Sequence, residues 1–434
     1  MSNDGTISSV VGTRRQRLYS PGTSRLPRPQ CPGLHKMLHI GYNNPAGTPT
    51  SGTGRSFQEE VHPIMAASTP TQTKTLAPKP KRKAGYDAHA EFNLRTAEHA
   101  DSVIKSLGLT DEDLLHTYKQ MLEIRHFEEQ CGRSFRAGKV GGYLHVYIGQ
   151  EAVSQGVLHA CIPGDQALST YRDHAHCLVL GSDPHRIMAE IYGKSTGVSR
   201  GKGGSMHLFD KSVGFAGGYG IVGGNVPLAV GLGWALKHKN DLKDKHNVCV
   251  CFLGDGSMNA GGFHEAMNMA QLYELPILFV LENNKYAMGT SVERSHANTD
   301  LASRADSYAM AHSKVDGQDY FAVREAAQSI VNNMRLSPAP YFLEAVTYRY
   351  AGHGAADGAA TQITYRQPEE LDEWKQRDPV NILGDVLRKR GLLDDAKQAA
   401  LDSAAIAHAK EAAEYADSSP VCAPEELTQD VYAE

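Results

Sequence analysis

Residues 247–284 read NVCVCFLGDGSMNAGGFHEAMNMAQLYELPILFVLENN, and this stretch decides the fold. Its two apolar runs, at 247–256 and 276–284, do not alternate with polar residues, so each is predicted to be a strand buried on both faces. The segment between them, 261–275, has the length and composition of a helix. A strand, a helix and a strand in this order predict a βαβ unit, and hence an α/β fold with a mostly parallel sheet.

Each of the two predicted strands ends in polar residues. Asp255 lies between two glycines at the end of the first strand, and Asn284 is the second of two asparagines at the end of the second. Ligands of such sheets bind beyond the carboxyl ends of the strands, so we expect both side chains at one site. Carboxylate and amide oxygens suit Mg²⁺, which usually also binds substrate phosphate. The pair therefore predicts a magnesium and phosphate site, to which the carbonyl of Tyr286 can add a third protein oxygen.

The residues directly after Asp255 favour phosphate binding as well. Gly256 allows the backbone to approach a ligand closely. A helix is expected to start at Ser257, and its first N–H groups would favour an anion. Each motif alone is a common turn, but their joint position at the ends of successive strands is specific.

The first 85 residues differ in composition from the rest of the chain. They are rich in Gly, Pro, Ser, Thr and Arg, and no acidic residue occurs between Asp4 and Glu59. Such a segment buries too little apolar surface to offset the entropy of ordering, so residues 1–85 are predicted to be disordered or a mis-annotated extension. Two interpretations remain open: a mitochondrial transit peptide, or a true start at Met65 preceded by upstream sequence read in frame.

A globular domain is predicted over residues 86–382. Within it, Thr110 followed by three acidic residues indicates a helix N-terminus. Leu114, Tyr118, Met121 and Ile124 then recur at helical spacing and give the helix an apolar face. Residues 383–434 are Ala-rich and charged, and are expected to form a helical extension that packs on a partner subunit.

Composition limits the possible partners and compartments. A formal net charge of −5 indicates neither nucleic acid nor an anionic membrane as a partner. No run of 18 or more apolar residues occurs, so no membrane span is expected. The seven cysteines form no C-x-x-C pair, and Cys249 and Cys251 lie in an apolar run. We therefore expect buried thiols in a reducing compartment and no zinc site.

Seven motifs together resemble the alpha subunits of the thiamine diphosphate-dependent 2-oxo acid dehydrogenases, most closely the pyruvate dehydrogenase branch with two alpha and two beta chains. The resemblance covers roughly residues 109–415. The motifs are YLHVYIGQEA (143–152), TYRDHAH (170–176), GKGGSMH (201–207), GIVGGNVPL (220–228), GDGSMNAGGFHEAMNMA (254–270), ENNKYAMGTSVERS (282–295) and YRYAGH (348–353).

The resemblance implies a thiamine diphosphate-binding fold of the diphosphate-binding type, a mostly parallel sheet with helices on both faces. It implies thiamine diphosphate and Mg²⁺ as cofactors, with the metal held by the side chains of Asp255 and Asn284 and the carbonyl of Tyr286. His145 and His353 are implied as catalytic residues. The residues implied to bind the cofactor are Tyr171, Arg172, Gly220, Ile221, Val222, Asp255, Gly256, Ser257, Asn284, Tyr286, Arg349 and His353.

The implied activity is oxidative decarboxylation of pyruvate with reductive acetylation of a lipoyl group. The implied partners are a beta subunit, which supplies the glutamate that activates the cofactor, and the lipoyl acyltransferase component. The alternatives are the alpha subunit of a branched-chain 2-oxo acid dehydrogenase or of acetoin dehydrogenase, a catalytically silent structural subunit, and a phosphate-binding module without thiamine. Gly354 stands where animal mitochondrial members carry a phosphorylatable serine, which favours the bacterial cytoplasm over the mitochondrial matrix.

Overall fold

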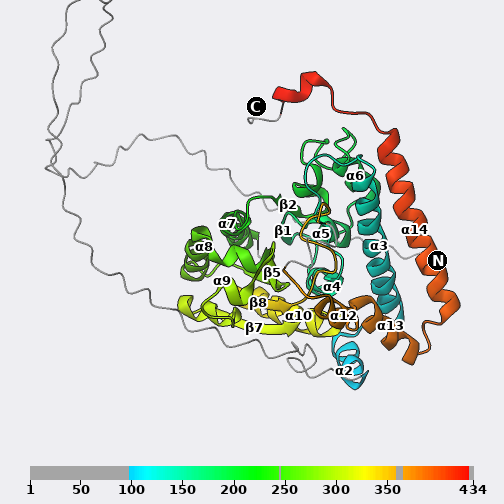
Figure 1. Cartoon of the computed structure of the whole chain (residues 1–434). Helices are drawn as coiled ribbons and strands as arrows, with labels where there is room; N and C mark the ends of the chain where they lie inside the picture. Colours follow the sequence, from blue (N-terminus) through cyan, green and yellow to red (C-terminus); the bar gives the residue numbers. More distant parts are fainter. Residues whose placement is uncertain (1–96, 244–245, 358–364, 430–434) are drawn as a thin grey trace, which may run out of the picture. The chain divides into compact units, whose positions relative to one another are not determined.

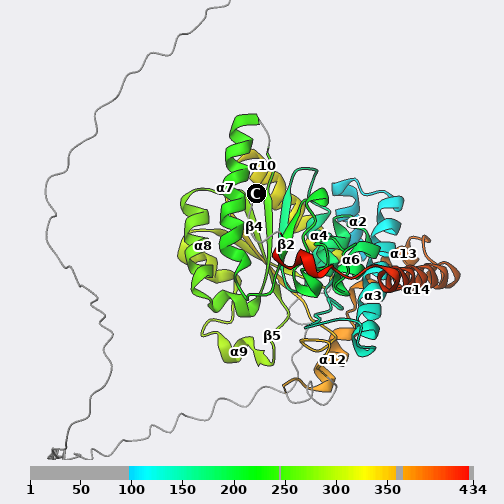
Figure 2. The ribbon, with the colours of Figure 1, turned by 90° about the horizontal axis from the view of Figure 1, so that it is seen from above.

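The computed structural model describes residues 97–243, 246–357 and 365–429 (Figures 1 and 2). The predictions made for residues 1–85 lie outside this range. Within the described residues, no helix is both long and apolar enough to cross a membrane.

A sheet of six parallel strands forms the centre of the fold, in the order β2-β1-β3-β4-β8-β7. Residues 247–284 supply the middle of the sheet, because β3 pairs with β4 in register from Cys249 opposite Ile277 to Gly254 opposite Glu282. The predicted βαβ unit is thereby confirmed. The strands are β1 (Gln166–Thr170), β2 (Phe215–Tyr219), β3 (Cys249–Gly254), β4 (Ile277–Asn283), β7 (Ala311–Asp316) and β8 (Tyr341–Val346).

Helices cover both faces of the sheet, as expected. Val250 and Phe252 of β3 belong to one apolar cluster, which α4 (Glu151–Leu158) and α10 (Tyr320–Leu336) complete. The alternate residues Cys249 and Cys251 belong to a second cluster on the other face, under α7 (Asn225–Lys243) and α8 (Gly261–Leu272). Successive side chains of a strand point to opposite faces of the sheet, and here both faces are covered by helices. Each position of the strand is therefore buried, which explains why the run is apolar throughout. Both cysteines are fully buried, as predicted.

The predicted helix after Thr110 is α3 (Asp111–Arg136). Thr110 and Asp113 form a reciprocal capping box, in which the Asp113 N–H donates to the Thr110 hydroxyl and the Thr110 N–H to the Asp113 carboxylate. The four apolar residues predicted to share a face are all buried. Preceding it, α2 (Ala97–Leu107) packs in the same apolar cluster as the first turns of α3.

The C-terminal part is helical, with α12 (Pro368–Lys375), α13 (Pro379–Lys389) and α14 (Asp395–Ser418). Figures 1 and 2 show α14 running alongside α3, and it also packs on α6 (Pro184–Ile191). Its buried residues are all alanines, which allow close approach of the helix backbones. Packing of this segment on a partner subunit remains a prediction.

One detail of the sequence-based prediction is wrong. The chain does not enter an α-helix at Ser257, because residues Asp255–Asn259 form a short 3-10 helix, η3, and α8 begins only at Gly261. The Ser257 hydroxyl donates to the carbonyl of Gly254 and so stabilises the tighter turn. The remaining short elements near the site are α5 (His174–Val179), η1 (Gly204–Met206), β5 (Tyr286–Ala287), β6 (Thr290–Ser291) and α9 (Val292–Ser295).

Candidate active site

A cleft of about 580 Å³ opens beyond the carboxyl ends of β1, β3 and β4. This volume lies within the range of pockets that hold a cofactor or drug-sized ligand. Of the residues predicted to bind the cofactor or to act in catalysis, only Arg349 lies outside its lining. Those that line it are His145, Tyr171, Arg172, Gly220, Ile221, Val222, Asp255, Gly256, Ser257, Asn284, Tyr286 and His353.

The two predicted metal ligands follow neighbouring strands, Asp255 after β3 and Asn284 after β4. Both are buried, and their Oδ2 and Oδ1 atoms respectively have no hydrogen-bond partner among the described residues. The Asn284 amide Nδ2 donates to Gln150 Oε1 at 3.0 Å, which leaves its oxygen for another group. Because buried polar atoms are rarely unpaired, two unpaired oxygens in one cleft fit a hard cation such as Mg²⁺.

Burial raises the pKa of Asp255 to about 6, although Arg349 and Lys285 act in the opposite direction. A carboxylate without a compensating partner is costly to bury in its ionised form. A bound cation would reverse this effect and hold the carboxylate ionised. The raised pKa of Asp255 therefore fits a site at which a bound cation would compensate the charge of the carboxylate.

Gly256 packs closely against β5, and this contact leaves no room for a side chain at position 256. A Cβ atom added there would lie 2.7 Å from the Cβ of Ala287, in β5. Since β5 begins two residues after Asn284, any side chain at 256 would push apart the two segments that carry the predicted metal ligands. The predicted role of this glycine thus has a second cause besides access for phosphate.

Three aromatic side chains in the cleft lining, His145, Tyr171 and His353, lie together and form what we call the histidine wall. The ring of His145 lies 4.5 Å from that of Tyr171 and 4.9 Å from that of His353, measured between centroids. His145 Nδ1 lies 2.8 Å from the His353 carbonyl oxygen, so this nitrogen carries the proton and Nε2 is left to accept. Burial, followed by the nearby Arg172, lowers the pKa of His145 to about 4 and that of His353 to about 3. Both rings are neutral at physiological pH.

Arg172 is a buried cation that faces carbonyl groups. Its guanidinium donates to the carbonyl oxygens of Val146 at 2.7 Å and His353 at 2.9 Å. Carbonyl dipoles compensate only part of a buried charge, and burial lowers the pKa of Arg172. An anionic ligand in the cleft would supply the rest, and the guanidinium geometry suits phosphate oxygens.

Arg349 lies behind the lining. Its guanidinium donates to the Met288 carbonyl at 2.6 Å and lies 3.3 Å from the Tyr365 hydroxyl. Arg366 in turn donates to the Arg349 carbonyl at 2.8 Å. These bonds join the YRYAGH segment to the hairpin after Asn284, so Arg349 shapes the cleft from outside. Its contact with a cofactor remains a prediction.

Several lining residues were not predicted from the sequence: Tyr143, Thr170, Met206, Tyr219, Glu282 and Met288. Glu282 is the most informative of them. It accepts a hydrogen bond from the Tyr147 hydroxyl, and His176 Nε2 lies 3.3 Å from it. A charged residue within an otherwise apolar strand, two positions before Asn284, was a signal that could have identified it.

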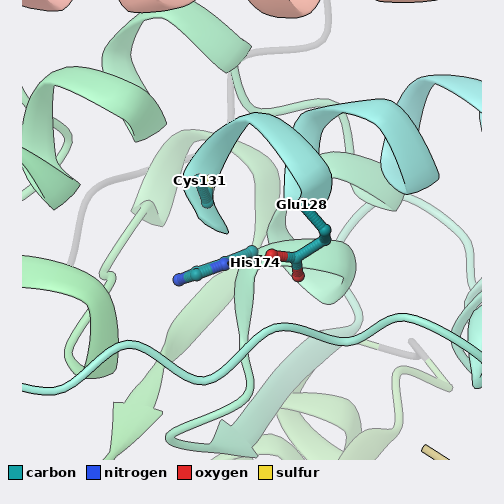
Figure 3. Close-up of side chains that lie close together, drawn as sticks. All are labelled: Glu128, Cys131 and His174. Atoms are coloured by element: carbon teal, nitrogen blue, oxygen red, sulfur yellow. Dashed lines mark hydrogen bonds and ion pairs between the residues drawn. The ribbon is translucent and has the colours of Figure 1, made fainter. Parts of the chain in front are cut away.

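Among the described residues, one other buried group has the residue types of a metal site, namely Glu128, Cys131 and His174 (Figure 3). Glu128 accepts from the Tyr147 N–H at 3.0 Å and lies 2.9 Å from His174 Nδ1. His174 Nε2 lies 3.0 Å from the Ser205 carbonyl. Because these ligand atoms already have partners within the chain, the group ties α3 and α5 to the segment around Ser205 and is not assigned as a metal site.

The sequence from residue 119 to 425 matches the family model described as "Dehydrogenase E1 component". Three bacterial relatives carry the name pyruvate dehydrogenase E1 component subunit alpha. The chain is 40% identical to the protein of Rickettsia conorii over 323 residues, which cover 74% of this chain and 97% of the relative. It is 44% identical to that of Zymomonas mobilis over 318 residues (73% and 87%), and 40% identical to that of Rhizobium meliloti over 321 residues (74% and 90%). The chain therefore belongs to the dehydrogenase E1 component family, which has the thiamine diphosphate-binding fold.

Proposed function

We propose that this chain is the alpha subunit of a pyruvate dehydrogenase, which decarboxylates pyruvate and transfers the acetyl group to a lipoyl carrier. The observation that carries the proposal is the pair of unpaired buried oxygens, Asp255 Oδ2 and Asn284 Oδ1, in a cleft of cofactor size. Family membership and the name shared by its bacterial relatives support the same reaction.

In this proposal the chain holds the diphosphate end of the cofactor. The Asp255 carboxylate, the Asn284 amide oxygen and the Tyr286 carbonyl would hold Mg²⁺, and Arg172 would contact a phosphate oxygen. When bound, thiamine diphosphate supplies a ring that accepts the electron pair released on decarboxylation. Gly220, Ile221 and Val222 border the cleft and would contact the remainder of the cofactor.

In this proposal the two histidines of the histidine wall transfer protons and orient the substrate. His145 and His353 are neutral, so each can donate a hydrogen bond from one nitrogen and accept at the other. His145 is held by the His353 carbonyl, which leaves its Nε2 to accept a hydrogen bond or a proton. We assign both residues to proton transfer or to stabilisation of charge that develops on the substrate oxygen.

A beta subunit is proposed to complete the site. Apolar side chains at the cleft are strongly exposed in this chain, with 77% exposure at Ile221 and 69% at Tyr143. Large exposed apolar residues next to a site are typical of a protein interface. The partner would cover this edge and exclude water from the cleft. Assembly as two alpha and two beta chains, interaction with the lipoyl acyltransferase and a bacterial cytoplasmic location belong to the same proposal.

Co-expression with a beta subunit of the same enzyme family tests the function. The purified complex should require Mg²⁺ and thiamine diphosphate and should prefer pyruvate to branched-chain 2-oxo acids and to acetoin. Preference for either alternative substrate would reassign the chain within its family. A complex that turns over none of the three while it binds the cofactor would support the silent-subunit alternative.

A further inference from the structure

The glycine-rich loop, residues 197–207, follows α6 and forms part of the cleft wall. Met206 lines the cleft, and the ring of His207 faces Gly220, where an added Cβ would lie 3.0 Å from His207 Nε2. His207 Nδ1 lies 3.2 Å from the Gly218 carbonyl, which fixes the ring against the end of β2. A shift of this loop would therefore change the wall at the position proposed to contact the cofactor.

One buried carboxylate organises the inner side of the glycine-rich loop. Glu190, at the end of α6, accepts N–H groups from Ser199 at 2.8 Å and Gly201 at 2.7 Å on Oε2, and from Gly203 at 2.7 Å and Gly204 at 3.2 Å on Oε1. Glu190 is completely buried. Four main-chain donors on one carboxylate fix the path of a segment that has little secondary structure of its own.

The tail segment, residues 419–429, follows α14 (Figure 1) and contacts the outer, solvent-exposed residues of the glycine-rich loop. Lys194, just before the loop, pairs with Val421 in an antiparallel bridge. The Ser195 N–H donates to the Pro420 carbonyl at 3.0 Å. These contacts join two parts of the chain that lie more than 200 positions apart in the sequence.

Arg200 is the main polar contact between the loop and the tail segment. Its guanidinium donates to Glu426 Oε2 and to Gln429 Oε1, each at 3.2 Å. Its carbonyl accepts from the Cys422 thiol at 3.1 Å. Arg200 has a φ of 60°, a conformation that costs energy for a residue with a side chain and that persists only where surrounding contacts enforce it. The tail segment supplies those contacts.

We propose that the tail segment is a clamp that positions the glycine-rich loop as a wall of the cofactor cleft. Glycine-rich segments lose much conformational entropy when they are ordered, so an ordered wall needs contacts on both sides. Glu190 provides the inner contacts and the tail segment provides the outer ones. The effect on catalysis rests on the proposed function, whereas the ordering of the loop does not.

A chain that ends at Ser418, assembled with the beta subunit, tests the clamp. Hydrogen exchange of the amides in residues 197–207 should become faster, while exchange in β3 and β4 stays unchanged. KM for thiamine diphosphate should rise about tenfold, which corresponds to about 1.4 kcal/mol, with kcat at saturating cofactor within about twofold of wild type. Unchanged loop exchange in the truncated chain would overturn the proposal.

Exchange of the two charges of the Arg200–Glu426 ion pair distinguishes loss of loop positioning from general destabilisation of the protein. It also tests the clamp if the truncated chain does not assemble with the beta subunit. Arg200→Glu and Glu426→Arg should each speed up loop exchange and raise KM about two- to fivefold, because the ion pair is partly exposed. The double variant should recover wild-type values, and Glu425→Ala, at the neighbouring carboxylate, serves as the control. Single variants without effect on exchange, or no recovery in the double variant, would refute the clamp. A wild-type complex that needs no thiamine diphosphate would refute the proposed function and leave the exchange result valid.

Discussion

Replacement of Asp255 by asparagine should affect stability and cofactor binding in opposite directions. The side chain is 2% exposed, and burial raises its pKa from 3.8 to about 6. At 1.36 kcal/mol per pKa unit, this rise corresponds to roughly 3 kcal/mol of destabilisation of the folded, metal-free protein when Asp255 is ionised. Because the folded-state pKa lies above the unfolded value, the destabilisation is complete above about pH 6 and disappears below 3.8.

Asp255→Asn removes the charge and keeps the shape. Without cofactor at pH 7, the variant complex should therefore be more stable than wild type, by up to about 3 kcal/mol. The same change removes the anionic ligand, so affinity for magnesium thiamine diphosphate should fall more than about 100-fold, beyond the usual effect of losing an outer-shell partner of a metal ligand. Denaturant unfolding with and without the cofactor measures the first effect, and calorimetric titration measures the second.

Asp165→Asn is the matched control, because Asp165 is a buried carboxylate at the opposite end of the sheet. It precedes β1 and lies 2.6 Å from Arg335 in an ion pair. Loss of this pair should lower stability while cofactor affinity stays at the wild-type value. Cofactor affinity that is unchanged in Asp255→Asn, or reduced equally in Asp165→Asn, would refute the assignment of Asp255 to the metal.

Three further outcomes are expected. His353→Ala should lower turnover at least tenfold without loss of folding, as measured by steady-state kinetics and circular dichroism; wild-type turnover would remove His353 from the mechanism. Because burial lowers the folded-state pKa of His145 to about 4, below the unfolded value of 6.5, its contribution to stability should be lost as the pH falls from 6.5 toward 4. His145→Gln should flatten the dependence of unfolding free energy on pH over that interval, and an unaltered curve would contradict the buried, neutral state. The chain purified without its beta subunit should not decarboxylate pyruvate, and substantial activity in a radiolabelled CO₂-release assay would refute a site shared between two chains.

The sequence was sufficient for the centre of the fold because that centre has a repeating pattern. Burial of β3 and β4 on both faces follows from their continuous apolar runs, and the order of strand, helix and strand specifies parallel pairing. Asp255 and Asn284 could be located for the same reason, since residues that follow adjacent parallel strands must meet at one edge of the sheet. Neither inference required knowledge of any side-chain orientation.

The parts that could not be predicted depend on contacts between distant residues. Gln150, which orients the Asn284 amide, lies 134 positions before it. Glu190 has no sequence feature that marks it as the acceptor of four main-chain N–H groups in the glycine-rich loop. The motif that predicts a cofactor contact for Arg349 gave no sign of its hydrogen bond to the neighbouring hairpin, and the cofactor contact stays a prediction. Motifs locate the residues of a site, whereas tertiary packing decides what each of them contacts.

The charges of the cleft define the ligand more sharply than its volume does. Asp255 is a buried anion whose free oxygen faces no donor among the described residues, and Arg172 is a buried cation that carbonyl dipoles compensate only in part. A neutral ligand would leave Asp255 uncompensated and Arg172 partly compensated, and an organic anion alone would compensate only Arg172. A divalent cation bound to a diphosphate satisfies both, because the cation meets Asp255 while the phosphate oxygens remain available to the guanidinium. The neutral histidines in the same cleft add no competing charge, so in the proposed complex the metal and Arg172 would determine the position of the bound anion.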